Sequence, residues 1–226
     1  MVFTAHYDTP AASVFPNIMI PRNQPLFWAY QFLPITFMLA IGLTLSYLIG
    51  MVWLKDERAY MLTFLAIYYG LYFLMFRGPS NPKNYNDNTS GVITLLEIYD
   101  RLSPQARDEV ALLFFDNEEK GVLGSGQFRH KHKQLIGKKL LINFDCVSDG
   151  DFFLLAATKE ARQLYGEQIE KAFVSTEEKT VLINKMEKVY YPSDHAGFSV
   201  AVAVAALKHK PYIGYYIDRI HTNKDT

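Results

Sequence analysis

The stretch LLFFDNEEKGVL, residues 112–123, changes from apolar to acidic in its middle. Its first four residues have the composition of a buried strand, and Asp116, Asn117, Glu118 and Glu119 follow directly. Neighbouring carboxylates repel one another, so this cluster at the end of a strand requires a physical reason. Either the acidic groups belong to a loop that faces water, or they surround a bound cation.

Around this stretch, strand-like and helix-like segments alternate along the chain. The strand-like segments are EVALLFF (109–115), KLLINFD (139–145), DFFLLAA (151–157), VAVAALK (202–208) and YIGYYI (212–217). The helix-like segments are TSGVITLLEIYDRL (89–102), GSGQFRHKHKQL (124–135, a loop entering a helix) and KEARQLYGEQIEKAF (159–173). Such alternation predicts an α/β fold, with a mostly parallel central sheet and helices on both of its faces.

Composition limits the classes of function. The chain has 226 residues, enough for one well-packed domain, and 23 basic residues balance 23 acidic ones. This neutral balance argues against binding to nucleic acid, which requires a basic surface. The single cysteine, Cys146, excludes an internal disulfide and is expected to be a buried, inert thiol. No secretory signal opens the chain, and its first residues already resemble a central strand, so a fragment of a longer protein stays an alternative.

Two long apolar segments interrupt the α/β pattern. No charged side chain occurs in 26–54 or in 59–76, and the charged link KDER (55–58) separates them. About 20 helical residues cross the hydrocarbon core of a bilayer, so the first segment is long enough to span it with some tilt. Trp28 and Trp53 lie near the two ends of the first segment, as interfacial aromatics do. Pro34 is expected to begin or kink this helix.

We therefore predict an inserted transmembrane helical hairpin. It occupies residues 25–78, contacts the lipid bilayer through residues 26–76, and makes the protein an integral membrane protein. Residues 1–24 and 79–226 then form the two parts of one soluble domain. The alternative is a hydrophobic arm that packs against a partner subunit. The charges that flank the hairpin leave the side of the membrane open, and the oligomeric state is also open.

Polar groups of the kinds that bind metals follow several predicted strands. In a parallel sheet the carboxyl ends of the strands share one edge, where ligand sites gather. The groups expected at that edge are His6, Asp8, Glu118, Glu119, Asp145 and His221. Asp87 precedes NTSG, where a helix begins, so its carboxylate is expected near free backbone amide groups. Imidazole and carboxylate ligands suit zinc. Taken alone, His6 fits a hydrogen-bonded core histidine and the glutamate pair fits a solvated loop. The joint pattern favours a metal site.

The motifs are similar to those of a known family. HYD (6–8), NDNTSG (86–91), DNEEKGVLGS (116–125), NFD (143–145), YYPSDH (190–195) and RIHTNKDT (219–226) occur in the order found in the co-catalytic zinc exopeptidases. That family includes secreted bacterial leucyl aminopeptidases, glutamate carboxypeptidases and glutaminyl cyclases. The chain departs from the family in two ways. The sequence starts at the HYD strand and stops at Thr226, whereas other members have sheet and helix ahead of HYD and more chain after the last histidine. It also carries an apolar hairpin where they have a short loop.

The resemblance implies a three-layer αβα fold and a dinuclear zinc site. His6 and Asp145 would bind one zinc ion, Glu119 and His221 the other, and Asp87 would bridge the two. Manganese or cobalt are alternatives at such a carboxylate-rich site.

The resemblance also assigns three residues to catalysis on a peptide substrate. Glu118 matches the general acid/base, Asp8 matches the carboxylate that orients the first histidine, and Tyr190 matches a tyrosine that stabilises the oxyanion. Tyr191 is the alternative for this last role.

The predicted function is a membrane-anchored, zinc-dependent exopeptidase of aminopeptidase type. A glutaminyl cyclase-like acyl transfer and a non-catalytic receptor or scaffold on the same fold are the alternatives. Ser193, Asp194 and His195 are adjacent in sequence and are not expected to form a catalytic triad, because adjacent side chains diverge. The HKHK run (130–133) is expected to be a solvated helix face.

Overall fold

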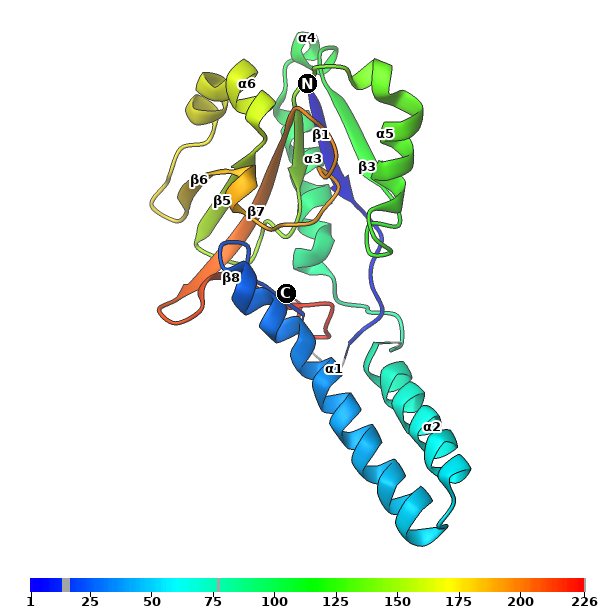
Figure 1. Cartoon of the computed structure of the whole chain (residues 1–226). Coiled ribbons are helices and arrows are strands. Elements are labelled where there is room, and N and C mark those ends of the chain that lie inside the picture. The colour runs from blue at the N-terminus through cyan, green and yellow to red at the C-terminus, as the bar shows by residue number, and fades with distance from the viewer. Residues whose placement is uncertain (14–16, 77, 226) are drawn as a thin grey trace.

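The computed structural model describes residues 1–13, 17–76 and 78–225. In its sheet, β1 (Val2–His6) runs parallel to the edge strand β3 (Ala111–Phe115) on one side and to β4 (Leu141–Phe144) on the other. The long strand β7 (Ala201–Lys210) lies parallel to β4. The carboxyl ends of β1, β3 and β4 therefore lie at one edge of the sheet, as Figure 1 shows.

The remaining strands extend the sheet beyond β7. Strand β5 (Phe152–Ala157) is antiparallel to β7 and parallel to β6 (Thr180–Lys185). Strand β8 (Gly214–Ile220) turns back along the end of β7, and β2 (Asn17–Met19) pairs with β8 in antiparallel fashion. The predicted mostly parallel, mixed sheet is confirmed as an eight-stranded sheet.

Helices cover both faces of the sheet. Leu95 of α3 (Ser90–Arg101) and Ile169 of α6 (Lys159–Ala172) pack in one apolar cluster with Phe3. Phe128 of α5 (Leu123–Ile136) packs in another cluster with Val2. Because successive strand residues point to opposite faces, α3 and α6 cover one face and α5 covers the other. The αβα layering is thus confirmed. A short helix, α4 (Pro104–Arg107), precedes β3.

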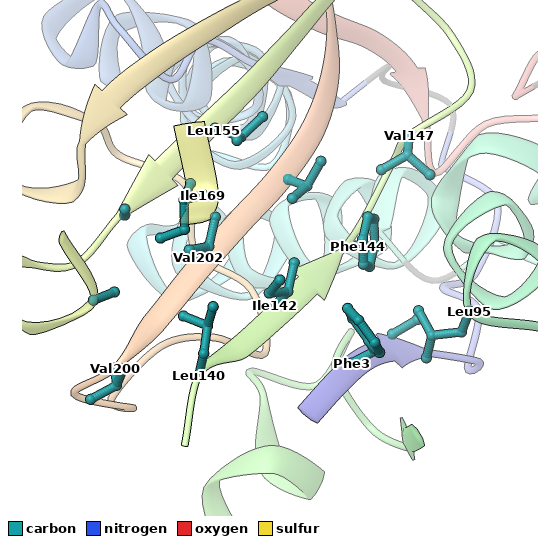
Figure 2. Close-up of a cluster of buried hydrophobic side chains, with 14 residues drawn as sticks. Phe3, Leu95, Leu140, Ile142, Phe144, Val147, Leu155, Ile169, Val200 and Val202 are labelled. Carbon is teal, nitrogen blue, oxygen red and sulfur yellow. The ribbon is translucent and has the colours of Figure 1, made fainter. Parts of the chain in front are cut away.

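The largest apolar cluster fixes the strands that lead to the carboxyl edge. Figure 2 shows Phe3, Ile142 and Phe144 of the central strands beside Leu95 of α3. The rings of Phe3 and Phe144 are 6.3 Å apart, and Leu95 is fully buried. Burying a side chain of this size stabilises the fold by about 1.5–3 kcal/mol. Close packing here therefore sets where His6 and Asp145 emerge from β1 and β4.

Three strands differ from the sequence-based prediction. YIGYYI was predicted as a strand over 212–217, but β8 begins at Gly214, because residues 211–213 form the turn after β7. β2 and β6 were not predicted. β2 has only three residues, and β6 is an edge strand with no buried position whose apolar run is only three residues long, bounded by Thr180 and Asn184.

The apolar segments form a pair of antiparallel helices. Helix α1 (Gln24–Ser46) continues through Pro34 and runs on as a π-helix, η1 (Tyr47–Trp53), before α2 (Glu57–Phe76) returns. Asn23 caps α1 by accepting the Leu26 amide at 3.2 Å, and Asp56 caps α2 by accepting the Arg58 amide at 2.7 Å. A Cβ atom on Gly50 would lie 2.2 Å from the Tyr60 backbone, so glycine permits the close approach of the two helices.

This hairpin (residues 24–76) projects from the domain and exposes apolar side chains. Figure 1 shows it extending from the end of the sheet at which the β1 arrow ends. The helix over Gln24–Trp53 is the one helix in the described residues that is long and apolar enough to cross a membrane. Only 22% of its most apolar stretch is buried. That low burial distinguishes it from a core helix of the domain.

Candidate metal centre

All of the predicted metal-binding side chains lie at the carboxyl edge of the sheet. His6 is the last residue of β1, and Asp145 directly follows β4. Glu118 and Glu119 lie in the loop after β3, and His221 directly follows β8. Asp87 lies in a π-helical turn, η2 (Tyr85–Thr89), just before α3. The edge thus brings together residues from nearly the whole length of the chain.

These side chains form two donor sets that share Asp87. In the first set, His6 Nε2 lies 3.2 Å from Asp87 Oδ1 and 3.6 Å from Asp145 Oδ1. In the second set, His221 Nε2 lies 3.1 Å from Asp87 Oδ2 and 3.0 Å from Glu119 Oε2. Donor atoms within each set are at most 4.8 Å apart. The two oxygens of Asp87 therefore face two different histidines.

The buried polar atoms of this cluster fit a group of divalent cations. His6 Nε2, Asp145 Oδ1 and Glu119 Oε1 are buried, and among the described residues they have no partner with hydrogen-bond geometry. Such atoms are costly to bury unless something else satisfies them. Imidazole nitrogen and carboxylate oxygen are the ligand types that zinc prefers in catalytic sites. The donor set therefore suits zinc.

Asp8 supports both the histidine and the glutamate pair. The Nδ1 atom of His6 lies 3.2 Å from the Asp8 carbonyl oxygen and 3.5 Å from its carboxylate. The same carboxylate accepts the backbone N–H groups of Glu118 at 3.1 Å and Glu119 at 3.2 Å. Orientation of a metal-binding imidazole through its second nitrogen is a common supporting contact. Asp8 lies where the predicted orienting role requires it.

A network that the sequence analysis missed holds Asp87 in place. The backbone N–H groups of Asn86 and Asp87 donate to the Asp225 carboxylate at 3.2 and 3.0 Å. The Asn88 side chain donates to the Phe144 carbonyl oxygen at 3.0 Å and accepts from the Cys146 N–H at 3.2 Å. Only the NDN run around Asp87 hinted at this network in the sequence. Asp225 lies within the RIHTNKDT motif, but the sequence analysis assigned it no role, because Asp87 is far away in the chain.

Without cations, the two glutamates hold protons unusually tightly. Burial, followed by the negative charge of Asp145, raises the pKa of Glu118 to about 9. Burial, followed by the charge of Asp87, raises the pKa of Glu119 to about 7. The carboxylates of the cluster therefore repel one another, and nearby positive charge would reduce this repulsion.

The pKa values of the two histidines are also raised, but by their carboxylate neighbours and not by burial. Burial alone would lower the pKa of His6, but contacts with Asp145, Asp8 and Asp87 outweigh it and raise that pKa well above its usual value. His221 behaves likewise, because Asp87 and Glu119 outweigh its burial and raise its pKa. The two histidines in turn hold the pKa of Asp87 well below its usual range against the effect of burial. The neighbouring carboxylates thus favour the protonated form of both histidines.

The two candidate tyrosines differ in their surroundings. Tyr191 is buried and its hydroxyl donates to the Asp145 carbonyl oxygen at 3.1 Å, so it supports the strand end that carries Asp145. The Tyr190 ring lies against α1 of the hairpin, 5.1 Å from the Phe27 ring and 5.6 Å from the Trp28 ring.

The adjacent Ser193, Asp194 and His195 are all buried. The Ser193 hydroxyl accepts a hydrogen bond from the Asn143 side chain at 2.9 Å, and the His195 ring stacks at 6.3 Å on Tyr191. The segment braces the sheet edge beside the cluster. The HKHK run lies exposed on α5, as predicted.

We expect zinc binding to release protons and to strengthen as pH rises. A cation must displace the protons that His6 and His221 hold, because their pKa values are raised, and Glu118 and Glu119 add to the release. Affinity should therefore be higher at about pH 8 than at about pH 6. Calorimetry in buffers with different ionisation heats measures the release. His132→Ala on the exposed face of α5 should not alter it, and a binding heat independent of the buffer would contradict this account.

Comparison with known proteins identifies the family. Residues 78–226 match the model of peptidase family M28. The match includes Asp87, Glu118, Glu119, Asp145 and His221, whereas His6 and Asp8 lie outside it. Searches of the curated proteins and of the solved structures gave no significant match. The matched region is about two-thirds of the chain and contains most of the metal-donor cluster. The chain therefore belongs to peptidase family M28, the zinc-dependent metallopeptidases that its sequence motifs resemble.

Proposed function

We propose that this chain is a membrane-anchored aminopeptidase that works with two zinc ions. The observation that carries the proposal is the pair of donor sets that share Asp87, one with His6 and one with His221. A carboxylate whose two oxygens face two different imidazoles is placed to act as a ligand that bridges two cations. A single cation would leave one of the two histidines without a role at the site.

In this proposal each cation has its own histidine and its own terminal carboxylate. His6 and Asp145 hold one ion, and Glu119 and His221 hold the other. The chemistry that bound cations supply is polarisation of the scissile carbonyl group and activation of the attacking water. Manganese or cobalt are possible substitutes, because the set is rich in carboxylates.

Glu118 is proposed as the general base and then the general acid. It lies beside the donor cluster, within 4.8 Å of a donor atom of His6 and one of Glu119, and belongs to neither of the sets that contain Asp87. Nearby positive charge lowers its raised pKa, which gives the carboxylate form at neutral pH. Glu118 then takes a proton from the attacking water and passes it to the leaving amine.

Two further residues support this chemistry in the proposal. Asp8 keeps the His6 ring in the orientation that leaves Nε2 free for a cation, and it also fixes the backbone of Glu118. Tyr190 donates its hydroxyl to the oxyanion that develops on the scissile carbonyl. Tyr190 suits this role better than Tyr191, because the Tyr191 hydroxyl already donates to the Asp145 carbonyl.

The hairpin is proposed to anchor the enzyme in a lipid bilayer. Large apolar side chains are exposed on α1 and α2, for example Phe32 at 57%, Leu62 at 63% and Leu74 at 67%. Soluble monomeric proteins rarely expose contiguous apolar surface on this scale. Because the hairpin leaves the domain at the end of the sheet where β1 terminates, the metal centre would lie near the membrane surface (Figure 1).

We expect Glu118→Gln to abolish most peptidase activity and to leave zinc content unchanged. The amide cannot accept a proton, and loss of a general base lowers turnover by about 10²–10⁴-fold. Hydrolysis of a panel of aminoacyl amides and elemental analysis of bound zinc measure the two effects. Glu167→Gln, at an exposed position on α6, is the matched control and should behave as the parent chain. Activity near the parent level in Glu118→Gln would refute the role.

We also expect the full chain to remain in the membrane fraction after washing with high salt and alkaline carbonate, and to be released by detergent. The physical reason is the apolar, exposed surface of the hairpin. Leu43→Lys places a charge at an exposed apolar position of α1 and should reduce membrane retention, whereas Leu164→Lys on α6 should not. Recovery of active chain entirely in the soluble fraction would count against the anchor.

A further inference from the structure

The second ring nitrogen of His221 faces a side chain outside the donor cluster. Nε2 of His221 points to Asp87 and Glu119, and Nδ1 lies 3.4 Å from the side-chain amide nitrogen of Asn17. The Asn17 amide thus contacts Nδ1 of His221, just as the carbonyl and carboxylate groups of Asp8 contact Nδ1 of His6. The two histidines of the site therefore have supports of different chemistry, one with a charged group and one neutral.

The backbone brings Asn17 to this place. In the short antiparallel pair of β2 and β8, Asn17 lies opposite Ile220, the residue before His221. The Ser13 N–H also donates to the His221 carbonyl oxygen at 2.8 Å. His221 has φ +60°, a left-handed conformation that a non-glycine residue seldom adopts without surrounding constraints. The segment that leads from β1 to the hairpin therefore constrains the backbone on both sides of His221.

The apolar hairpin holds the Asn17 side chain. Gln31 of α1 donates its side-chain amide to Asn17 Oδ1 at 3.0 Å. One turn earlier on the same helix face, Phe27 is 6% exposed and packs among the buried residues beside β8 and Tyr190. This contact seats the first turns of α1 against the domain. A continuous path of contacts thus joins α1 to His221 through Gln31 and Asn17.

The side-chain amide of Asn17 can act as a hydrogen-bond donor or acceptor, so it can also support His221 when that residue binds a cation. When Nε2 binds a cation, the proton of the neutral imidazole resides on Nδ1, which becomes a donor and needs an acceptor. Rotation of the Asn17 amide by half a turn presents Oδ1 to Nδ1–H and turns Nδ2 toward Gln31. The same rotation at Gln31 presents its oxygen to Nδ2. The His221–Asn17 and Asn17–Gln31 hydrogen bonds are then both kept.

We infer that Asn17 is a positioning residue for His221 and that α1, through Gln31, holds Asn17 in place. The affinity of one of the two cations therefore depends on the seating of the hairpin, whereas the His6 ion depends on Asp8. The inference rests on the proposed two-ion function. It gives the hairpin a second role beside anchoring, because any change in the seating of α1 alters occupancy of the His221 ion.

The test is stepwise zinc binding to the metal-free full chain in mild detergent, measured by competition with a chromogenic chelator. Asn17→Leu keeps the side-chain size and removes both polar atoms, and it should weaken one of the two binding steps by about 10–100-fold. Asn17→Asp restores an acceptor and should recover that step. Gln31→Leu should weaken the same step by less. Gln24→Leu, at an exposed position of the same helix, is the matched control and should bind as the parent chain.

The possible results separate this inference from the proposal beneath it. A parent chain that binds fewer than two zinc ions overturns the dinuclear centre. A parent chain that binds two ions, with both steps unchanged in Asn17→Leu, overturns the positioning role alone. Equal weakening in Asn17→Asp and Asn17→Leu also overturns it, because the acceptor would then not matter. Urea unfolding of each variant separates a local effect from loss of the fold.

Discussion

The site depends on one carboxylate, Asp87, whose two oxygens are contacted by His6 and by His221. One histidine ends the first strand and the other follows the last, while Asp87 stands before α3. No short segment can produce this arrangement, so the sheet and its buried core are required to assemble it. The packing of Phe3 and Leu95 behind β1 and the hydrogen bonds of Asp225 to the backbone at Asp87 are parts of the same construction.

Buried like charges are what make the assembly sensitive to cations. Asp87, Glu118, Glu119 and Asp145 lie together at the sheet edge, and burial of carboxylates without positive charge is unfavourable. The raised pKa values of the two histidines and the two glutamates reflect this cost, because bound protons reduce the net negative charge. In the proposed function, divalent cations would offset this cost more strongly and would lower the raised pKa of Glu118, so that its carboxylate could act as a base. In this account, the acidic groups at the end of LLFFDNEEKGVL lie together because bound cations would balance their negative charge.

The sheet and the metal-binding side chains could be predicted from the sequence, but the residues that hold those side chains in place could not. Parallel strands end at a common edge, so strand prediction was sufficient to place His6, Glu119 and Asp145 together. Strand prediction assigned no role to Asp225 or Asn17, because each contacts a residue far away in the chain through one or two hydrogen bonds. β2 and β6 were missed because their apolar runs, Ile18–Met19 and Val181–Ile183, are too short to predict a strand from the sequence alone. The apolar hairpin was evident from composition, but its contact with Tyr190 was not.

The hairpin and the metal centre meet at the same end of the domain, so anchoring and catalysis share structural elements in this account. The central claim is that one carboxylate joins two cations, and anomalous diffraction from crystals of the zinc-loaded chain tests it most directly. Two zinc peaks about 3.5–4 Å apart, with Asp87 between them, are the predicted result. A single peak, or two peaks that do not share Asp87, would contradict the account.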